Sequence, residues 1–113
     1  MKSNMMMALA CASLAVFSSG ALARGDMAAG QAKAKQVCAA CHGENGDKPL
    51  QPEYPILAGQ HVDYLTKALK DYKSGARKNA IMGAQAQALS AKDIDDVTAW
   101  FSSQSGPLHV KKR

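Results

Sequence analysis

The chain has 113 residues and carries 14 lysines and arginines against 9 acidic residues, a formal net charge of +5. This length allows one small domain. The scattered lysines, the low aromatic content and the lack of any nucleic-acid-binding signature argue against a nucleic-acid partner.

Residues 1 to 23 have the pattern of a secretory signal peptide. Lys2 provides the positive start, the stretch from Met5 to Phe17 is almost wholly apolar, and a small-x-small cleavage site ends at Ala23. The apolar stretch is shorter than the roughly 20 residues that span a bilayer, which leaves an uncleaved anchor as the less favoured alternative. We therefore expect export, cleavage after Ala23, and a mature domain of residues 24 to 113 without a stable membrane span.

The mature chain begins with a predicted helix from Met27 to Val37, for which Asp26 is the expected cap. Gly30 lies inside this helix, where a glycine is costly unless something packs closely against it. Residues 43 to 60 contain repeated glycines and prolines and are expected to form a loop.

Two further helices are predicted. Apolar residues recur at helical spacing between Val62 and Tyr72, and that helix should stop near Gly75. A capping-box pattern from Ser90 to Asp93 opens the last helix, whose apolar face comprises Ile94, Val97, Trp100 and Phe101. No segment alternates with a strand period, so we predict an all-α domain with three main helices and loops.

The run Cys38-Ala39-Ala40-Cys41-His42 is the most informative motif of the chain. Cys-x-x-Cys-His is the attachment signature of a c-type haem, in which two thiols add to the porphyrin vinyl groups and the histidine binds the iron. Cys11 is expected to leave with the signal. A thioredoxin-like pair, a zinc site or a simple disulfide are the alternatives. They fit less well, because no βαβ pattern or second ligand pair is present and a disulfide would not explain His42.

The composition agrees with a cofactor. A mature chain this short buries a small fraction of its surface and is marginally stable alone. It is also rich in alanine and poor in large apolar residues. We expect one covalently bound haem c to provide much of the core and the protein to unfold without it.

Met82 is the predicted second axial ligand. The mature chain has two methionines, and Met27 is poorly placed because it begins the helix that leads directly to the haem motif. Met82 lies in the segment from Lys78 to Gly83, which we expect to be a polar loop that can reach the opposite haem face. Core filling is the alternative role of this methionine. His61 and His109 are expected to be surface histidines.

The sequence resembles class I cytochromes c, in particular the bacterial branch that includes dihaem cytochromes and their single-haem relatives. The resemblance covers nearly all of residues 25 to 104. It is carried by the glycine eight positions before the haem motif and by several short segments: Cys38 to Gly43, Tyr54 to Gln60, Tyr64-Leu65, Gly75 to Arg77, Asn79 with Met82, Leu89-Ser90 and Ala99 to Phe101.

The resemblance implies a role for each candidate site residue. Cys38 and Cys41 would form the thioethers, while His42 and Met82 would be the axial ligands of the iron. Pro55 would offer its carbonyl oxygen to the other ring nitrogen of His42 and orient the imidazole.

The same resemblance bears on three further residues: two have an implied contact, and one departs from the family pattern. Gly30 would let the first helix touch the last one at Trp100, and Arg77 would approach a haem propionate. Ala80 departs from the family pattern, which has a proline two residues before the distal methionine. Without the proline, the Met82 segment is expected to be less rigid.

These observations predict a periplasmic, single-haem electron carrier that is not itself an enzyme. The alternatives are a haem-bearing subunit of a periplasmic dehydrogenase, or a gas-binding or sensor protein if Met82 does not ligate the iron. We expect redox proteins as partners (an oxidase, a reductase or a dehydrogenase) and a monomer or weak dimer. Docking would be partly electrostatic, through lysines expected to border the haem edge: Lys48, Lys73, Lys78 and Lys92.

Overall fold

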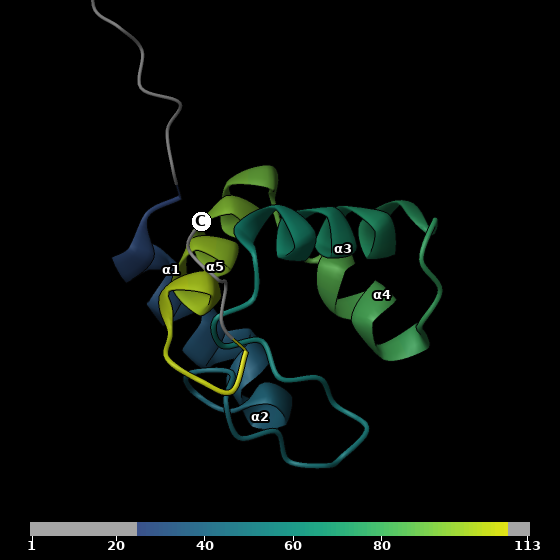
Figure 1. Cartoon of the computed structure of the whole chain (residues 1–113). Helices are drawn as coiled ribbons and strands as arrows, with labels where there is room; N and C mark the ends of the chain where they lie inside the picture. Colours follow the sequence, from purple (N-terminus) through teal and green to yellow (C-terminus); the bar gives the residue numbers. More distant parts are fainter. Residues whose placement is uncertain (1–24, 109–113) are drawn as a thin grey trace, which may run out of the picture.

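The computed structural model describes residues 25–108, which form helices and loops with no β-strand among them (Figure 1). The expected signal peptide and the basic tail therefore lie outside the described residues. In chain order the elements are α1 (Met27–Lys33), the π-helix η1 (Ala34–Cys38), α2 (Ala39–His42), α3 (Val62–Ser74), α4 (Ala80–Gln87) and α5 (Ala91–Ser103).

The first three elements follow one another without a break. Asp26 caps α1 by accepting a hydrogen bond from the Ala29 N–H at 3.0 Å. The helical run extends past the predicted end at Val37 and includes the whole haem motif. It ends at Gly43, whose φ of +85° is a conformation that residues with a Cβ rarely adopt.

Helices α1 and α5 pack closely, and Gly30 is the point of nearest approach. A Cβ built on Gly30 would lie 2.0 Å from the Asp96 carbonyl oxygen and 3.1 Å from the Trp100 Cβ. Only a glycine allows the two helices to come this close. The expected contact between Gly30 and the last helix is present, and the Asp96 backbone is even nearer than Trp100.

The predicted second and third helices are confirmed. Helix α3 ends at Gly75, which is left-handed with φ of +84°. Helix α5 opens with the complete capping box: Ser90 Oγ accepts from the Asp93 N–H at 3.0 Å, and Asp93 Oδ2 accepts from the Ser90 N–H at 3.0 Å. The segment between residues 43 and 61 has no regular helix or strand.

A small core joins these helices. It comprises Ala34, Leu65, Val97 and Phe101, which come from η1, α3 and α5. Partly buried apolar side chains pack against this cluster: Cys38, Leu57, Leu69 and Trp100. The packing therefore brings the first residue of the haem motif against the centre of the domain.

Helix α4 corrects the sequence-based expectation of a loop from Lys78 to Gly83. Asn79 caps this helix, since its Oδ1 accepts hydrogen bonds from the N–H groups of Ile81 and Met82, both at 3.0 Å. The alanines, glutamines and Met82 that follow are good helix formers. They carry no amphipathic pattern, which explains why apolar periodicity did not indicate the helix. The fold thus has a short helix beyond the three main ones.

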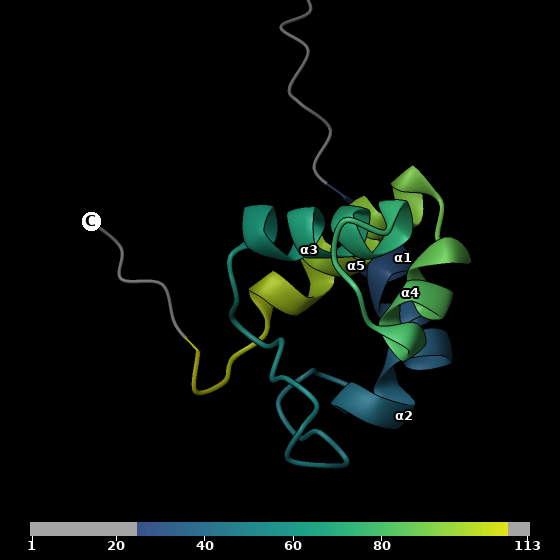
Figure 2. The ribbon, with the colours of Figure 1, turned by 90° about the vertical axis from the view of Figure 1, so that its right-hand side faces the viewer.

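The elements separate into two parts. Helices α1, α3 and α5 pack together, while α2 and the loop from residue 43 to 61 extend away from α3 (Figure 1). Figure 2 shows α4 between the level of α3 and that of α2, on the side of the molecule where α2 lies. This arrangement places the helix carrying Met82 and the helix carrying the haem motif on one side of the domain.

Candidate haem site

A π-helical turn precedes the haem motif and sets the direction of Cys38. The Ala39 N–H bonds to the Ala34 carbonyl oxygen, the i to i+5 pattern that defines such a turn and that often marks a functional site. Gly30, Ala34 and Cys38 are spaced four residues apart. Because an α-helix has about 3.6 residues per turn, each would point in a direction rotated about the helix axis from the one before. The wider turn opposes this rotation, so Cys38 packs on the core next to buried Ala34.

Cys38 lacks the environment of a redox-active thiol. Burial raises the pKa of the Cys38 thiol to about 11, so this group stays protonated at neutral pH. Reactive Cys-x-x-Cys pairs need the opposite shift. Within residues 25–108, no group of three or more Cys, His, Asp or Glu side chains could hold a metal ion. The redox-pair and zinc alternatives therefore have no structural support in this part of the chain.

His42 ends α2 and is buried, with 6% of its surface exposed. Its Nδ1 lies 2.9 Å from the Pro55 carbonyl oxygen. Because a carbonyl oxygen can only accept, Nδ1 must carry the proton and Nε2 is left with a free lone pair. The Tyr54 ring is 6.3 Å away between ring centroids, tilted by 52°. The contact expected between Pro55 and His42 is thus present, and it leaves Nε2 as the nitrogen that can bind a metal.

Met82 is half-buried in the first turn of α4. Met27 is 47% exposed at the start of α1. Met82 is thus the less exposed of the two methionines, and it lies on the helix that packs against α3. Its role as a ligand stays a prediction.

Arg77 is engaged with α3. Its guanidinium lies 5.0 Å from the centroid of the Tyr72 ring, and Nη1 is 3.4 Å from the Tyr64 hydroxyl oxygen. The hydrogen bond to Tyr64 is the main cause that raises the arginine pKa above its usual value. The expected propionate contact stays a prediction.

The residues present fit a covalently attached haem. Two thiols and a histidine with a fixed tautomer come from one helical run, as the attachment chemistry requires. Large apolar side chains are exposed on several elements: Met27 of α1, Leu50 of the loop, Val62 and Tyr64 of α3, and Ile81 of α4 are 47%, 71%, 43%, 52% and 54% exposed. Helix α5 contributes no such residue. A flat apolar cofactor would cover surface of this kind.

These features define a small all-helical haem protein of the c type. The chain belongs to the cytochrome c family, whose sequence model matches residues 27–105. Members of this family are electron carriers, and one cytochrome c domain with one Cys-x-x-Cys-His motif implies one covalent haem c. The predicted family, the all-α haem-binding fold and the single haem are thereby confirmed.

Known relatives include proteins of two lengths. Cytochrome c4 of Pseudomonas aeruginosa is 49% identical over 82 residues, which are 73% of this chain and 40% of that protein. Cytochrome c-554(548) of Halomonas halodenitrificans is 47% identical over 83 residues, which are 71% of this chain and 98% of that protein. The chain therefore matches less than half of the first relative and nearly all of the second.

The crystal structure of reduced cytochrome c4 from Pseudomonas stutzeri has the same fold. It superposes with a TM-score of 0.66 at 43% identity, over 73% of this chain and 47% of that chain. A relative from Stutzerimonas stutzeri, described as a thiosulfate dehydrogenase electron acceptor, is 39% identical over 66% of this chain and 34% of its own length.

Sequence reasoning missed two residues that fix the position of α4. Gln87 Nε2 donates to the Lys73 carbonyl oxygen, and Lys73 Nζ donates to the Leu89 carbonyl oxygen. From the sequence, Lys73 is predicted only as a docking charge. No local pattern signals these contacts, since the partners are 14 and 16 residues apart.

Proposed function

We propose that this chain is a single-haem electron carrier in which His42 and Met82 are the axial ligands of a haem bound through Cys38 and Cys41. The haem iron, when bound, supplies the one-electron chemistry. The main support is the hydrogen bond from His42 Nδ1 to Pro55, which orients the ring and leaves Nε2 available. Two protein ligands would leave no open position for a substrate, which fits electron transfer without bond chemistry.

The ligand assignment is tested by Met82→Ala in the haem-loaded protein. We expect loss of the near-infrared sulfur-to-iron band, carbon monoxide binding to the reduced form, and a lower reduction potential, because Met/His ligation raises the potential. Met27→Ala is the matched control and should leave all three unchanged. If the band survives in Met82→Ala, another group is the ligand. If the unmodified protein already binds carbon monoxide at neutral pH, the gas-binding alternative is favoured.

The chain is proposed to function in the periplasm, with residues 1 to 23 as a signal peptide and residues 24 to 113 as the mature domain. The bacterial origin of the relatives and the sequence pattern of the first 23 residues support this. Within the described residues, no helix is both long and apolar enough to cross a membrane. An intact mass equal to residues 24 to 113 plus one haem would verify cleavage and attachment together. Haem that extracts into acid acetone would contradict covalent attachment.

The proposed partners are redox proteins: an oxidase, a reductase or a dehydrogenase. The relative described as a thiosulfate dehydrogenase electron acceptor favours a second candidate, in which this chain serves as the accepting subunit of a dehydrogenase. Purification from native membranes and soluble extract distinguishes the two. A free carrier elutes alone as a monomer or weak dimer, whereas a subunit co-elutes with an enzyme.

Of the four lysines in the docking hypothesis, Lys48 and Lys78 remain the best candidates. Both are exposed. Lys92 is paired with Asp96 at 2.5 Å, and the Lys73 ammonium is held by the Leu89 carbonyl oxygen. Those two cations are therefore less available to a partner.

Charge reversal tests this surface. Lys78→Glu should slow oxidation by an acidic partner in stopped flow more than Lys112→Glu does. Association should also slow as added salt shortens the Debye length from about 30 to about 8 Å. Rates independent of salt, or equal losses in both variants, would mean that docking is apolar or occurs elsewhere.

A further inference from the structure

Helix α4 carries Met82 but is weakly held by packing. It has eight residues, of which Ala86 alone is fully buried. It packs mainly on α3, and its other helix contacts are few. A helix this short is not stable by itself in water. Something besides apolar burial must fix its position.

The C-terminal end of α4 is tied to the end of α3 by a reciprocal pair of hydrogen bonds centred on Lys73. Gln87 Nε2 donates to the Lys73 carbonyl oxygen at 2.5 Å, while the Lys73 ammonium donates to the carbonyl oxygen of Leu89. The Lys73 carbonyl lies in the last turn of α3, where no intrahelical partner remains for it. Leu89 itself is buried. We call this arrangement of Lys73, Gln87 and Leu89 the α3–α4 clasp.

The N-terminal end of α4 is capped by Asn79. Its side chain accepts from the N–H groups of Ile81 and Met82. Ala80 stands where the resembled family has a proline, so the backbone here lacks the restriction on φ that proline imposes. The clasp is therefore the second anchor of a helix whose first anchor is a single capping residue.

We propose that Lys73 and Gln87 are positioning residues for Met82: the clasp holds α4 in place and so keeps the methionine sulfur available to the iron. This rests on the proposed function, because it requires Met82 to be the distal ligand. The clasp restrains the C-terminal end of α4, whereas Ala80 leaves the N-terminal end without the restriction on φ that a proline would impose. Its loss should increase the population in which the sulfur is detached.

The test uses the reduced, haem-loaded protein and the rate of carbon monoxide binding at saturating gas, which reports how often the ligand position opens. Gln87→Ala and Lys73→Met should each raise this rate about three- to tenfold, the effect of one lost hydrogen bond. The oxidised form should show a weaker near-infrared sulfur-to-iron band.

Two controls come from the same helices. Gln85 is exposed in α4, and its side chain makes no hydrogen bond within residues 25–108, so Gln85→Ala should leave rate and band unchanged. Lys70 is exposed on α3, and Lys70→Met should also have no effect. Lys73→Arg retains a donor and should restore most of the native rate.

The outcomes separate the proposal from the function on which it rests. If Met82→Ala keeps the near-infrared band, the ligand assignment fails and the positioning role fails with it. If Met82→Ala loses the band while Gln87→Ala and Lys73→Met match their controls, only the clasp proposal is overturned. Variants that lower the denaturation midpoint without changing carbon monoxide binding would show a merely structural role and would also overturn it.

Discussion

The α1–α5 pair and α4 are held by different means. Helices α1 and α5 are far apart in the sequence, but at Gly30 their backbones are in contact. Ala34, which follows α1, and Val97 and Phe101 of α5 belong to the buried core. Helix α4 is mostly exposed and is fixed by side-chain hydrogen bonds at its ends. The α1–α5 pair is therefore closely packed and has no room for a side chain at Gly30. Helix α4, which carries the proposed ligand Met82, depends more on hydrogen bonds than on packing.

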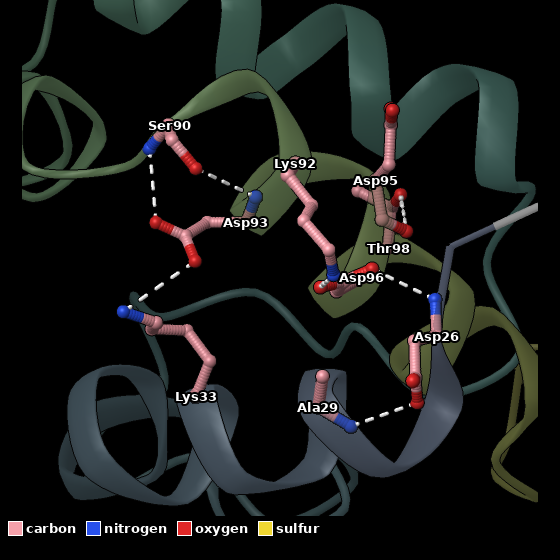
Figure 3. A network of polar contacts seen from close by, with 9 residues as sticks. All are labelled: Asp26, Ala29, Lys33, Ser90, Lys92, Asp93, Asp95, Asp96 and Thr98. Atoms are coloured by element: carbon pink, nitrogen blue, oxygen red, sulfur yellow. Dashed lines mark hydrogen bonds and ion pairs between the residues drawn. The ribbon is translucent and has the colours of Figure 1, made fainter.

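A polar network reinforces the α1–α5 pair (Figure 3). Asp96 of α5 is 4% exposed and accepts from the Asp26 N–H at 2.7 Å through Oδ1. Its Oδ2 pairs with Lys92 at 2.5 Å, which is the main cause of its lowered pKa. Lys33 of α1 reaches Asp93 at 3.4 Å. The start of α1 is thus tied to α5 by a hydrogen bond and its end by an ion pair, in addition to the close packing at Gly30.

Of the changes considered, loss of the haem should destabilise the fold most. In a Cys38→Ala, Cys41→Ala double variant we expect sharply reduced helical circular dichroism, because the short chain buries too little surface without the cofactor. Denaturing gels stained for haem peroxidase activity verify that the variant carries none. A cooperative, native-like thermal transition without haem would show that the α1–α5 pair is sufficient alone.

Gly30→Ala should have the next largest effect. The added methyl would meet the Asp96 carbonyl at 2.0 Å and force the helices apart, so we expect a loss of about 2 kcal/mol in the free energy of unfolding. Chemical denaturation of the haem-loaded protein measures it. A change within error would mean that α1 and α5 can separate without cost.

Gly83→Ala is the same substitution in α4 and should have the opposite sign. The nearest heavy atom to the added carbon would be the Tyr72 carbonyl oxygen at 4.0 Å, an ordinary contact. Alanine favours helix over glycine, so the free energy of unfolding should rise by about 0.5–1 kcal/mol. Equal losses at both glycines would remove the distinction between the two regions.

Asp96→Asn should have the smallest effect and one that depends on pH. The pKa of Asp96 is lowered in the folded protein, so its charge stabilises the fold above the unfolded value of about 3.9. That contribution is lost as the pH falls through the folded pKa. The difference in denaturation midpoint between the native protein and the variant should be present at pH 7, begin to shrink below about pH 4, and vanish once the pH is below the folded pKa. A constant difference would assign the effect to packing.

Local patterns predicted the parts of the fold that depend on neighbouring residues. The capping box at Ser90, the glycine stop at Gly75 and the helical spacing from Val62 to Tyr72 each need only a few consecutive residues. The haem motif is equally local, since three functions fall within five residues. The same approach failed for α4, where an asparagine cap and good helix formers carry no apolar period.

The sequence by itself determined the cofactor class, the family and the main helices, because covalent attachment and helix caps are written in short runs of residues. Only the tertiary structure decided which nitrogen of His42 is free, why Gly30 must be a glycine, and how α4 is anchored. Each of these depends on groups that are distant in the chain: Pro55 for His42, Asp96 for Gly30, and Lys73 for Gln87. Contacts across such separations form only when the helices pack, so no local pattern can specify them.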